Sequence, residues 1–341
     1  MKRRMAQRAR FMVPNFRAIV LAAAFGCTAV GAAQADCRGH DLLPQLKARA
    51  PASYAVMETE KRSIPFGQGK LFRLSREGRE PSYLFGSLHL ADRRITEFSP
   101  QLHAALTGAK VVALETTDTG ASLDRATRRD QLELRKALLA ERGRRPDRLL
   151  DTADLSDFDR IFGGRSIWTI PARELKISVL SLLDQPQCAP GHSSADELIA
   201  EIARERQTPL AGLETVIEQV TILDGLSRAT ERDLLVATLR QADHSEDMVE
   251  TTIVRHQNGD LGGLLAWMRS PEPIPGVAGA QTPPAFIERL ITLRNHRMRD
   301  RALPLLKKGG AFIAVGAAHL PGREGLLQLL EQDGYRVELI E

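Results

Sequence analysis

Two motifs of the same form, a glycine followed by two residues and then a histidine, occur more than two hundred residues apart in this chain of 341 residues. The first ends at His89 and follows an apolar run at 83–85, and the second ends at His319 and follows an apolar run at 312–315. Short apolar runs of this kind are typical of buried strands. Each motif therefore places a histidine just past a strand, where glycine lets the chain bend sharply or approach a ligand closely.

Two glutamates occur in the same context. Glu115 follows the apolar residues 111–114, and Glu214 follows residues 209–213. In a parallel α/β sheet, ligands bind outside the carboxyl ends of the strands. We therefore expect four strand ends to form one site, from His89, Glu115, Glu214 and His319.

The first 35 residues have the pattern of a cleaved signal peptide. They contain six basic and no acidic residues, an apolar stretch at 18–30 and Ala-Gln-Ala at 33–35. The mature chain is expected to begin at Asp36 and to be exported, to the periplasm or outside the cell, with no stable membrane span. The alternatives are a membrane anchor, for which the apolar stretch is short, and lipidation at Cys27.

Removal of this segment changes the charge balance. The full chain has 47 basic and 43 acidic residues, a net charge of +4, whereas residues 36–341 carry 41 basic and 43 acidic residues. The basic excess belongs to the leader and not to a binding surface. We therefore expect no nucleic acid partner.

Two cysteines, Cys37 and Cys188, remain after the expected cleavage. An even pair in an oxidising compartment predicts a disulfide, here between the mature N-terminus and the middle of the chain. The alternative is two buried thiols. The sequence has no Cys-x-x-Cys motif, so a redox function is not expected.

The order of the strand and helix patterns predicts an α/β fold with a mixed, largely parallel central sheet flanked by helices. Residues 71–75 and 82–88 flank a turn and predict a hairpin, and a helix at 100–107 then leads to a strand at 110–114. A last strand, helix and strand are expected within residues 311–340.

The stretch at about 122–185 is charged and helix-prone, with almost no strand pattern. We interpret it as a helical insertion in a single domain that covers residues 36–341. Residues 271–284 are rich in proline, glycine and alanine and predict a loop. The helix that follows, at 286–306, is expected to be interrupted by Pro304.

Imidazoles and carboxylates together are suitable ligands for a divalent transition metal. Such a metal would activate a bound water and polarise a carbonyl. The sequence leaves open which glutamate would bind the metal and which would act as general base. A metal-free site, with a histidine as base and a glutamate that orients it, is also consistent, and either glutamate could instead cap the helix that follows it.

These motifs together resemble the TraB/GumN family, which includes the Tiki metalloproteases and is distantly similar to erythromycin esterases and ChaN-like haem-binding proteins. The resemblance covers most of the mature chain and is carried by residues 83–89, 113–115, 212–215, Gln219, Arg294, Asn295, Met298, 314–320 and Gly322. The first motif has Ser87-Leu88 where Thr-Ile or Thr-Met is more usual in the family. Little in the predicted insertion is recognisable, so substrate recognition is not implied.

The resemblance implies a divalent-metal-dependent hydrolase, with manganese or cobalt as the metal and a peptide or protein as the substrate. The implied metal-site residues are His89, His319 and Glu115, and the implied catalytic residues are Glu115, Glu214, Arg294 and Asn295. Arg294 could hold a carboxylate or an oxyanion, or it could form a salt bridge on a helix surface. Two other functions stay open: a haem or iron-ligand binding protein that uses the same histidines, and a non-catalytic interaction protein.

Overall fold

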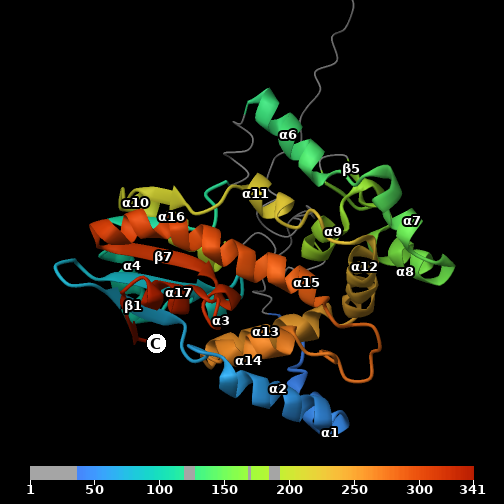
Figure 1. Ribbon diagram of the computed structural model, residues 1–341, viewed down its shortest axis with the longest axis horizontal. Coiled ribbons are helices and arrows are strands. Elements are labelled where there is room, and N and C mark those ends of the chain that lie inside the picture. The colour runs from blue at the N-terminus through green and yellow to red at the C-terminus, as the bar shows by residue number, and fades with distance from the viewer. Residues whose placement is uncertain (1–36, 119–126, 168–169, 184–192) are drawn as a thin grey trace, which may run out of the picture.

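The computed structural model describes residues 37–118, 127–167, 170–183 and 193–341 (Figure 1). The expected signal peptide, Cys27 and Cys188 lie outside these residues. Cleavage before Asp36 and the disulfide between Cys37 and Cys188 therefore remain predictions. Within the described ranges, no helix combines the length and the apolar character that crossing a membrane requires.

A six-stranded mixed sheet with the order β6-β3-β7-β2-β1-β8 lies at the centre of the fold. The strands β6, β3, β7 and β2 are parallel to one another, and β1 is antiparallel to both of its neighbours. The prediction of an α/β fold with a mixed, largely parallel sheet is confirmed. The strands are β1 (Leu71–Ser75), β2 (Ser82–Ser87), β3 (Val111–Leu114), β6 (Leu210–Gly212), β7 (Ala311–Gly316) and β8 (Arg336–Leu339).

The register brings the carboxyl ends of four neighbouring strands to one edge of the sheet. Ser87 of β2 lies opposite Gly316 of β7. Leu114 of β3 lies opposite Ala314 of β7 on one side and Gly212 of β6 on the other. The predicted unit of β2, the helix at 100–107 and β3 has parallel strands. These two strands are not neighbours, because β7 lies between them.

The predicted hairpin is confirmed. β1 and β2 pair antiparallel, with Leu71 opposite Phe85. Gly78 in the connecting turn has a φ of 68°, a conformation that glycine adopts at little cost. The last strand, β8, pairs with β1 and closes this side of the sheet.

Helices account for most of the remaining described chain. They are α1 (Leu43–Arg49), α2 (Pro51–Ser63), α3 (Arg93–Thr96), α4 (Pro100–Thr107), α6 (Arg128–Leu138), α7 (Pro146–Leu149), α8 (Thr152–Phe162), α9 (Ile177–Leu183), α10 (Ala195–Glu205), α11 (Val216–Thr221), α12 (Arg228–Ala242), α13 (Ser245–Gln257), α14 (Leu261–Met268), α15 (Pro284–Ile287), α16 (Arg294–Lys308) and α17 (Leu326–Gln332). The predicted loop at 271–284 is confirmed, since the structure has no helix or strand between α14 and α15 in this described part of the chain.

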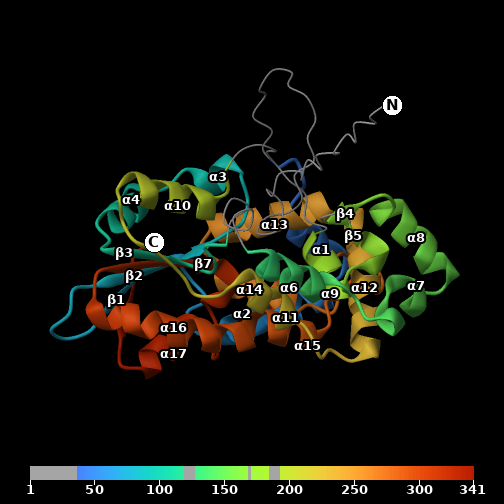
Figure 2. The same ribbon diagram turned by 90° about the horizontal axis from the view of Figure 1, so that it is seen from above.

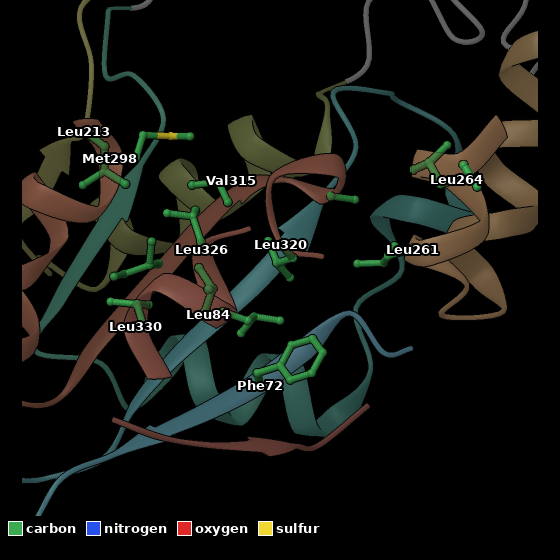
Figure 3. Close-up of a cluster of buried hydrophobic side chains, with 14 of the residues drawn as sticks. Phe72, Leu84, Leu213, Leu261, Leu264, Met298, Val315, Leu320, Leu326 and Leu330 are labelled. Carbon is green, nitrogen blue, oxygen red and sulfur yellow. The ribbon is translucent and has the colours of Figure 1, made fainter. Parts of the chain in front are cut away.

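Helices cover both faces of the sheet (Figure 2). On one face α4 and α10 pack Leu106 and Ile199 against Phe312 of β7. On the other face, α16 and α17 contribute Met298, Leu326 and other side chains to a cluster that includes Leu84 and Val315 of the sheet (Figure 3). The alternation of side chains along β2 and β7 thus buries both faces, which explains their nearly continuous apolar sequence.

The predicted helical insertion forms a second centre of packing, on the right of the sheet in Figure 1. Its helices α6, α8 and α9 bury apolar side chains, Phe158 and Leu180 among them, against α11 and α12. The described part of this stretch has little strand, in agreement with its nearly absent strand pattern. It contains a two-stranded sheet of β4 (Ser166–Ile167) and β5 (Ile170–Pro171).

The predicted interruption of the long C-terminal helix at Pro304 is wrong. Pro304 lies inside α16, which continues to Lys308. The proline is exposed and close to the end of the helix, so the carbonyl that it leaves unbonded faces water. The irregular segment lies upstream: residues Glu288–Leu293 form a π-helix that joins α15 to α16. Such wide turns are frequent at functional sites, and this one ends directly before Arg294.

Candidate active site

Three of the four expected side chains lie together at the carboxyl edge of the sheet. The Nε2 atoms of His89 and His319 lie 3.8 and 3.6 Å from the same oxygen, Oε1 of Glu115. Glu115 and His319 are buried, whereas the His89 side chain is 47% exposed. The group is therefore reached from solvent on the His89 side.

The motif glycines provide space rather than a special turn. Neither Gly86 nor Gly316 has a positive φ, so neither position depends on the conformational freedom of glycine, and the expected close approach to a ligand stays a prediction. A Cβ on Gly86 would lie 3.0 Å from Cα of Ala317, so the two motifs pack directly on each other. A Cβ on Gly316 would lie 3.0 Å from Oε1 of Glu115 and 3.6 Å from Nε2 of His89. It would fill the space that the three side chains face.

His89 is oriented by a carboxylate that the sequence analysis did not select. Nδ1 of His89 lies 2.6 Å from Oδ2 of Asp196, and Oγ of Ser87 donates to Oδ1 of Asp196 at 2.7 Å. The charge of Asp196 raises the pKa of His89 to about 9 against the opposing effect of burial, with a further contribution from Glu115. Asp196 sits in the first turn of α10, where acidic residues are common, so no sequence signal distinguishes it.

His319 is oriented by a neutral amide instead. Nδ1 of His319 donates to Oδ1 of Asn295 at 2.7 Å, and Nδ2 of Asn295 donates to the carbonyl of Glu324 at 2.7 Å. Burial and the charge of Arg294 lower the pKa of His319 to about 3 although Glu115 opposes them. His319 is therefore a neutral imidazole with its proton on Nδ1 and its lone pair on Nε2. In this arrangement Asn295 orients the ring of His319.

Arg294 lies buried between two carboxylates. It donates from Nη2 to Oε2 of Glu115 at 2.6 Å and from Nε to Oε2 of Glu214 at 2.8 Å. A third bond goes to the carbonyl of Leu290 in the π-helix. The alternative of a surface salt bridge is wrong because the Arg294 side chain is only 8% exposed. In this arrangement Arg294 binds two protein carboxylates and not an external group.

The two glutamates have different environments. Burial raises the pKa of Glu214, and Arg294 only partly offsets it. Burial would also raise the pKa of Glu115, but Arg294, the two histidines and the Gly316 N–H together hold it far below its usual range. Glu214 bonds Arg294 and Arg297 and does not reach the histidines. The helix-cap alternative is wrong for Glu214, because the cap of α11 is Thr215.

The donor atoms can be tested against a metal ion. Nδ1 of each imidazole is engaged by a protein acceptor. Both Nε2 atoms therefore face one space, where they could bind a metal ion, which is the usual arrangement of histidine ligands. The absent Cβ of Gly316 keeps that space open. Glu115 is less free, because Oε1 accepts from the Gly316 N–H at 2.6 Å and Oε2 accepts from Arg294. Accordingly, the described residues contain no group of three or more His, Cys, Asp or Glu side chains arranged to hold a metal. The two imidazoles fit a shared ion, and Glu115 as arranged does not complete a set of three.

The fold and site define an α/β protein with a histidine–glutamate–histidine group at the carboxyl edge of a mixed sheet. The chain matches the model of the TraB/PrgY/gumN family over residues 70–339, and it therefore belongs to this family. The resemblance that the two histidine motifs indicated is thereby confirmed.

Curated relatives include proteins named metalloproteases. The chain is 25% identical to Metalloprotease TIKI2 of Danio rerio over 308 residues, which cover 76% of this chain and 58% of the relative. It is 26% identical to Metalloprotease TIKI2 of Xenopus tropicalis, with 76% and 57% covered, and 28% identical to Metalloprotease TIKI1 of Homo sapiens, with 51% and 37% covered. The chain thus spans little more than half the length of the first two relatives. No solved structure matches it.

Proposed function

We propose that this protein is a metal-dependent hydrolase that cleaves peptide bonds in a peptide or protein substrate. The observation that carries the proposal is the placement of the His89 and His319 Nε2 atoms against one carboxylate oxygen. The substrate class comes from the relatives, which are named metalloproteases. Manganese or cobalt as the ion is what the resemblance to the family implies, and two imidazoles beside a carboxylate can hold several divalent metals.

Each residue has a proposed task. His89 and His319 hold the ion, and Glu115 supplies the negative charge beside it. When bound, the ion would lower the pKa of a water and polarise the scissile carbonyl. Asn295 holds the His319 ring, and Arg294 holds Glu115 in place with Glu214 as its second counter-charge. Glu214, Arg294 and Asn295 therefore act through their neighbours, and Glu115 is the one carboxylate at the reacting centre.

Export is part of the proposal. The leader pattern at residues 1–35 supports cleavage before Asp36 and a periplasmic or secreted protein. A disulfide between Cys37 and Cys188 would then be stable in an oxidising compartment. Intact-mass measurement of the exported protein, with and without reductant, tests both: a mass that includes the leader contradicts export, and free thiols contradict the disulfide.

Digestion of an unbiased peptide library tests the proposed activity. The protein is loaded with Mn²⁺ or Co²⁺ and compared with His319→Ala and with His103→Ala, which removes an exposed histidine on α4. We expect cleavage products from the native protein and His103→Ala, and none from His319→Ala. Equal and empty profiles from all three would contradict the hydrolase. A Soret band in the purified protein would support the haem-binding alternative instead.

A further inference from the structure

Asp196 connects two residues at the end of β2, Ser87 and His89, which are separated by Leu88. Its Oδ1 accepts from the hydroxyl of Ser87, and its Oδ2 bonds Nδ1 of His89. Both distances, 2.7 and 2.6 Å, are those of strong hydrogen bonds to a charged acceptor. The Asp196 side chain is 18% exposed and the Ser87 residue is fully buried, so little water competes for the bond between them.

The position of Asp196 on its helix does not account for these bonds. At the start of α10, the side chains of Ser194 and Glu197 accept hydrogen bonds from each other's backbone N–H groups and form a capping box. An acidic side chain in the first turn would be favoured by the helix dipole while pointing to solvent. Asp196 instead crosses to β2, where both of its carboxylate oxygens are used.

The second motif lacks this arrangement. Its residue at the position of Ser87 is Ala317, which has no hydroxyl, and His319 is held by the neutral Asn295. The site therefore combines one buried imidazole oriented by an amide with one exposed imidazole oriented by a carboxylate. An exposed ring has more freedom to rotate, so His89 is the histidine that needs the stronger partner.

We propose that Asp196 is a positioning residue of the site: held by Ser87, it fixes the ring of His89 so that Nδ1 is bonded and Nε2 faces Glu115. The orientation itself depends only on contacts within the chain. Its effect on a metal rests on the proposed function. A carboxylate behind a histidine ligand orients it and raises its basicity, and loss of such a partner costs 10- to 100-fold in metal affinity in other proteins.

The first arm of the test uses the metal-free protein. Nitrogen-15 NMR of labelled histidines reports the His89 ring, with the signal assigned by His89→Gln. We expect a Nδ1–H signal protected from solvent exchange in the native protein. Asp196→Ala should abolish the protection, Asp196→Asn, which keeps a neutral acceptor oxygen, and Ser87→Ala should weaken it, and Glu205→Gln, at the exposed far end of α10, should leave it unchanged.

The second arm is a titration with Co²⁺ followed by its visible absorption. We expect Asp196→Asn, in samples that circular dichroism shows to be folded before metal is added, to bind Co²⁺ about 10- to 100-fold more weakly than the native protein. Glu205→Gln should bind as the native protein does. If Asp196→Asn does not fold, Ser87→Ala decides the question, with a smaller loss expected in the same direction.

The two arms separate the two proposals. A native protein that binds no Co²⁺ but whose His89 signal is lost in Asp196→Ala contradicts the proposed metal-dependent function and supports the positioning role. A His89 signal that is unchanged in both Asp196→Asn and Ser87→Ala overturns the positioning role, whatever the metal does. Native-like Co²⁺ affinity in both variants overturns it as well.

Discussion

Arg294 is the residue on which the charge balance of the site depends. Its guanidinium bonds both Glu115 and Glu214 and offsets part of their combined charge, and all three side chains are less than a tenth exposed. Buried ion pairs contribute little net stability compared with apolar packing, but removal of one partner leaves an uncompensated buried charge. Arg294 is a fixed cation next to Glu115. Glu115 therefore stays anionic although it is buried, and its negative charge lies beside the two histidines.

We expect Arg294→Met to lower the free energy of unfolding by about 3–5 kcal/mol, because it leaves two buried carboxylates without their common partner. Urea denaturation followed by circular dichroism measures the change. Arg297→Met is the matched control, since Arg297 is 29% exposed and has one bond of 3.3 Å to Glu214; it should cost much less. Equal small losses in both variants would show that Arg294 is not essential to the charge balance.

His256 gives a second prediction at the scale of one residue. Its Nε2–H donates to the carbonyl of Gly86 at 2.7 Å, and none of the described residues bonds its Nδ1. Burial lowers its pKa from about 6.5 to about 4, against the hydrogen bond to Gly86. The unfolded chain therefore takes up this proton at a higher pH than the folded chain does, and stability falls as the pH decreases from 6.5 to 4.

We expect this group to remove about 3 kcal/mol of stability between pH 6.5 and pH 4, and nothing above pH 7. His256→Gln keeps a donor for Gly86 but cannot be protonated, so its unfolding free energy should fall less steeply over that range. Denaturation at a series of pH values checks the slope, with His103→Gln as the control. A slope identical in the native protein and His256→Gln would contradict the assignment.

At the scale of elements, the end of β7 depends on Gly316, which has no side chain. Gly316 has a φ of −53°, which any residue can adopt. The glycine is therefore required for space and not for backbone freedom. Its N–H also donates to Glu115, so the strand end supplies both the room and one of the bonds of the site.

We expect Gly316→Ala to fold, at a cost of about 1–3 kcal/mol for overpacking, and to lose Co²⁺ binding, because the methyl group occupies the space between His89 and Glu115. Gly143→Ala is the matched control, since a Cβ there meets no atom within 4 Å. Thermal unfolding and Co²⁺ titration of both variants test this. Native-like Co²⁺ affinity in Gly316→Ala would show that the space is not used.

The apolar pattern predicted the strands of this site well, and the resemblance named Arg294 and Asn295, but no sequence signal marked Asp196. The apolar runs before His89 and His319 mark buried strands because both faces of β2 and β7 are covered. Asp196 escaped detection because an acidic residue in a first turn is ordinary, and its target lies 107 residues away. The π-helix before Arg294 has no recognisable pattern either, since it differs from an α-helix only in its hydrogen bonds. Pro304 was misinterpreted because its exposure depends on tertiary packing.

At the scale of the whole molecule, two packing centres share one chain. One surrounds the sheet and carries the site. The other joins the insertion helices to α11 and α12. The segment from Glu214 to α11 links them, because Glu214 bonds α16 while α11 packs against α6. Because each centre has its own apolar cluster, we nevertheless expect the stability of the insertion to be separable from the geometry of the site.

Phe158 tests that separation. It is fully buried in the insertion cluster, with its ring centroid 5.2 Å from that of Phe162. We expect Phe158→Ala to lower the free energy of unfolding by about 3–5 kcal/mol and to leave Co²⁺ affinity unchanged under native conditions. Leu132→Ala, at a position 51% exposed, should be close to neutral. A parallel loss of Co²⁺ affinity in Phe158→Ala would mean that the two centres are coupled.

The location of a bound metal tests the central claim most directly. Crystals of the Co²⁺-loaded protein, measured at the cobalt absorption edge, give an anomalous difference map that shows the ion independently of any substrate. We predict a single strong peak within bonding distance of Nε2 of both His89 and His319, and no such peak in His319→Ala. A strong peak elsewhere in the protein, or none at these two nitrogens, would contradict the account.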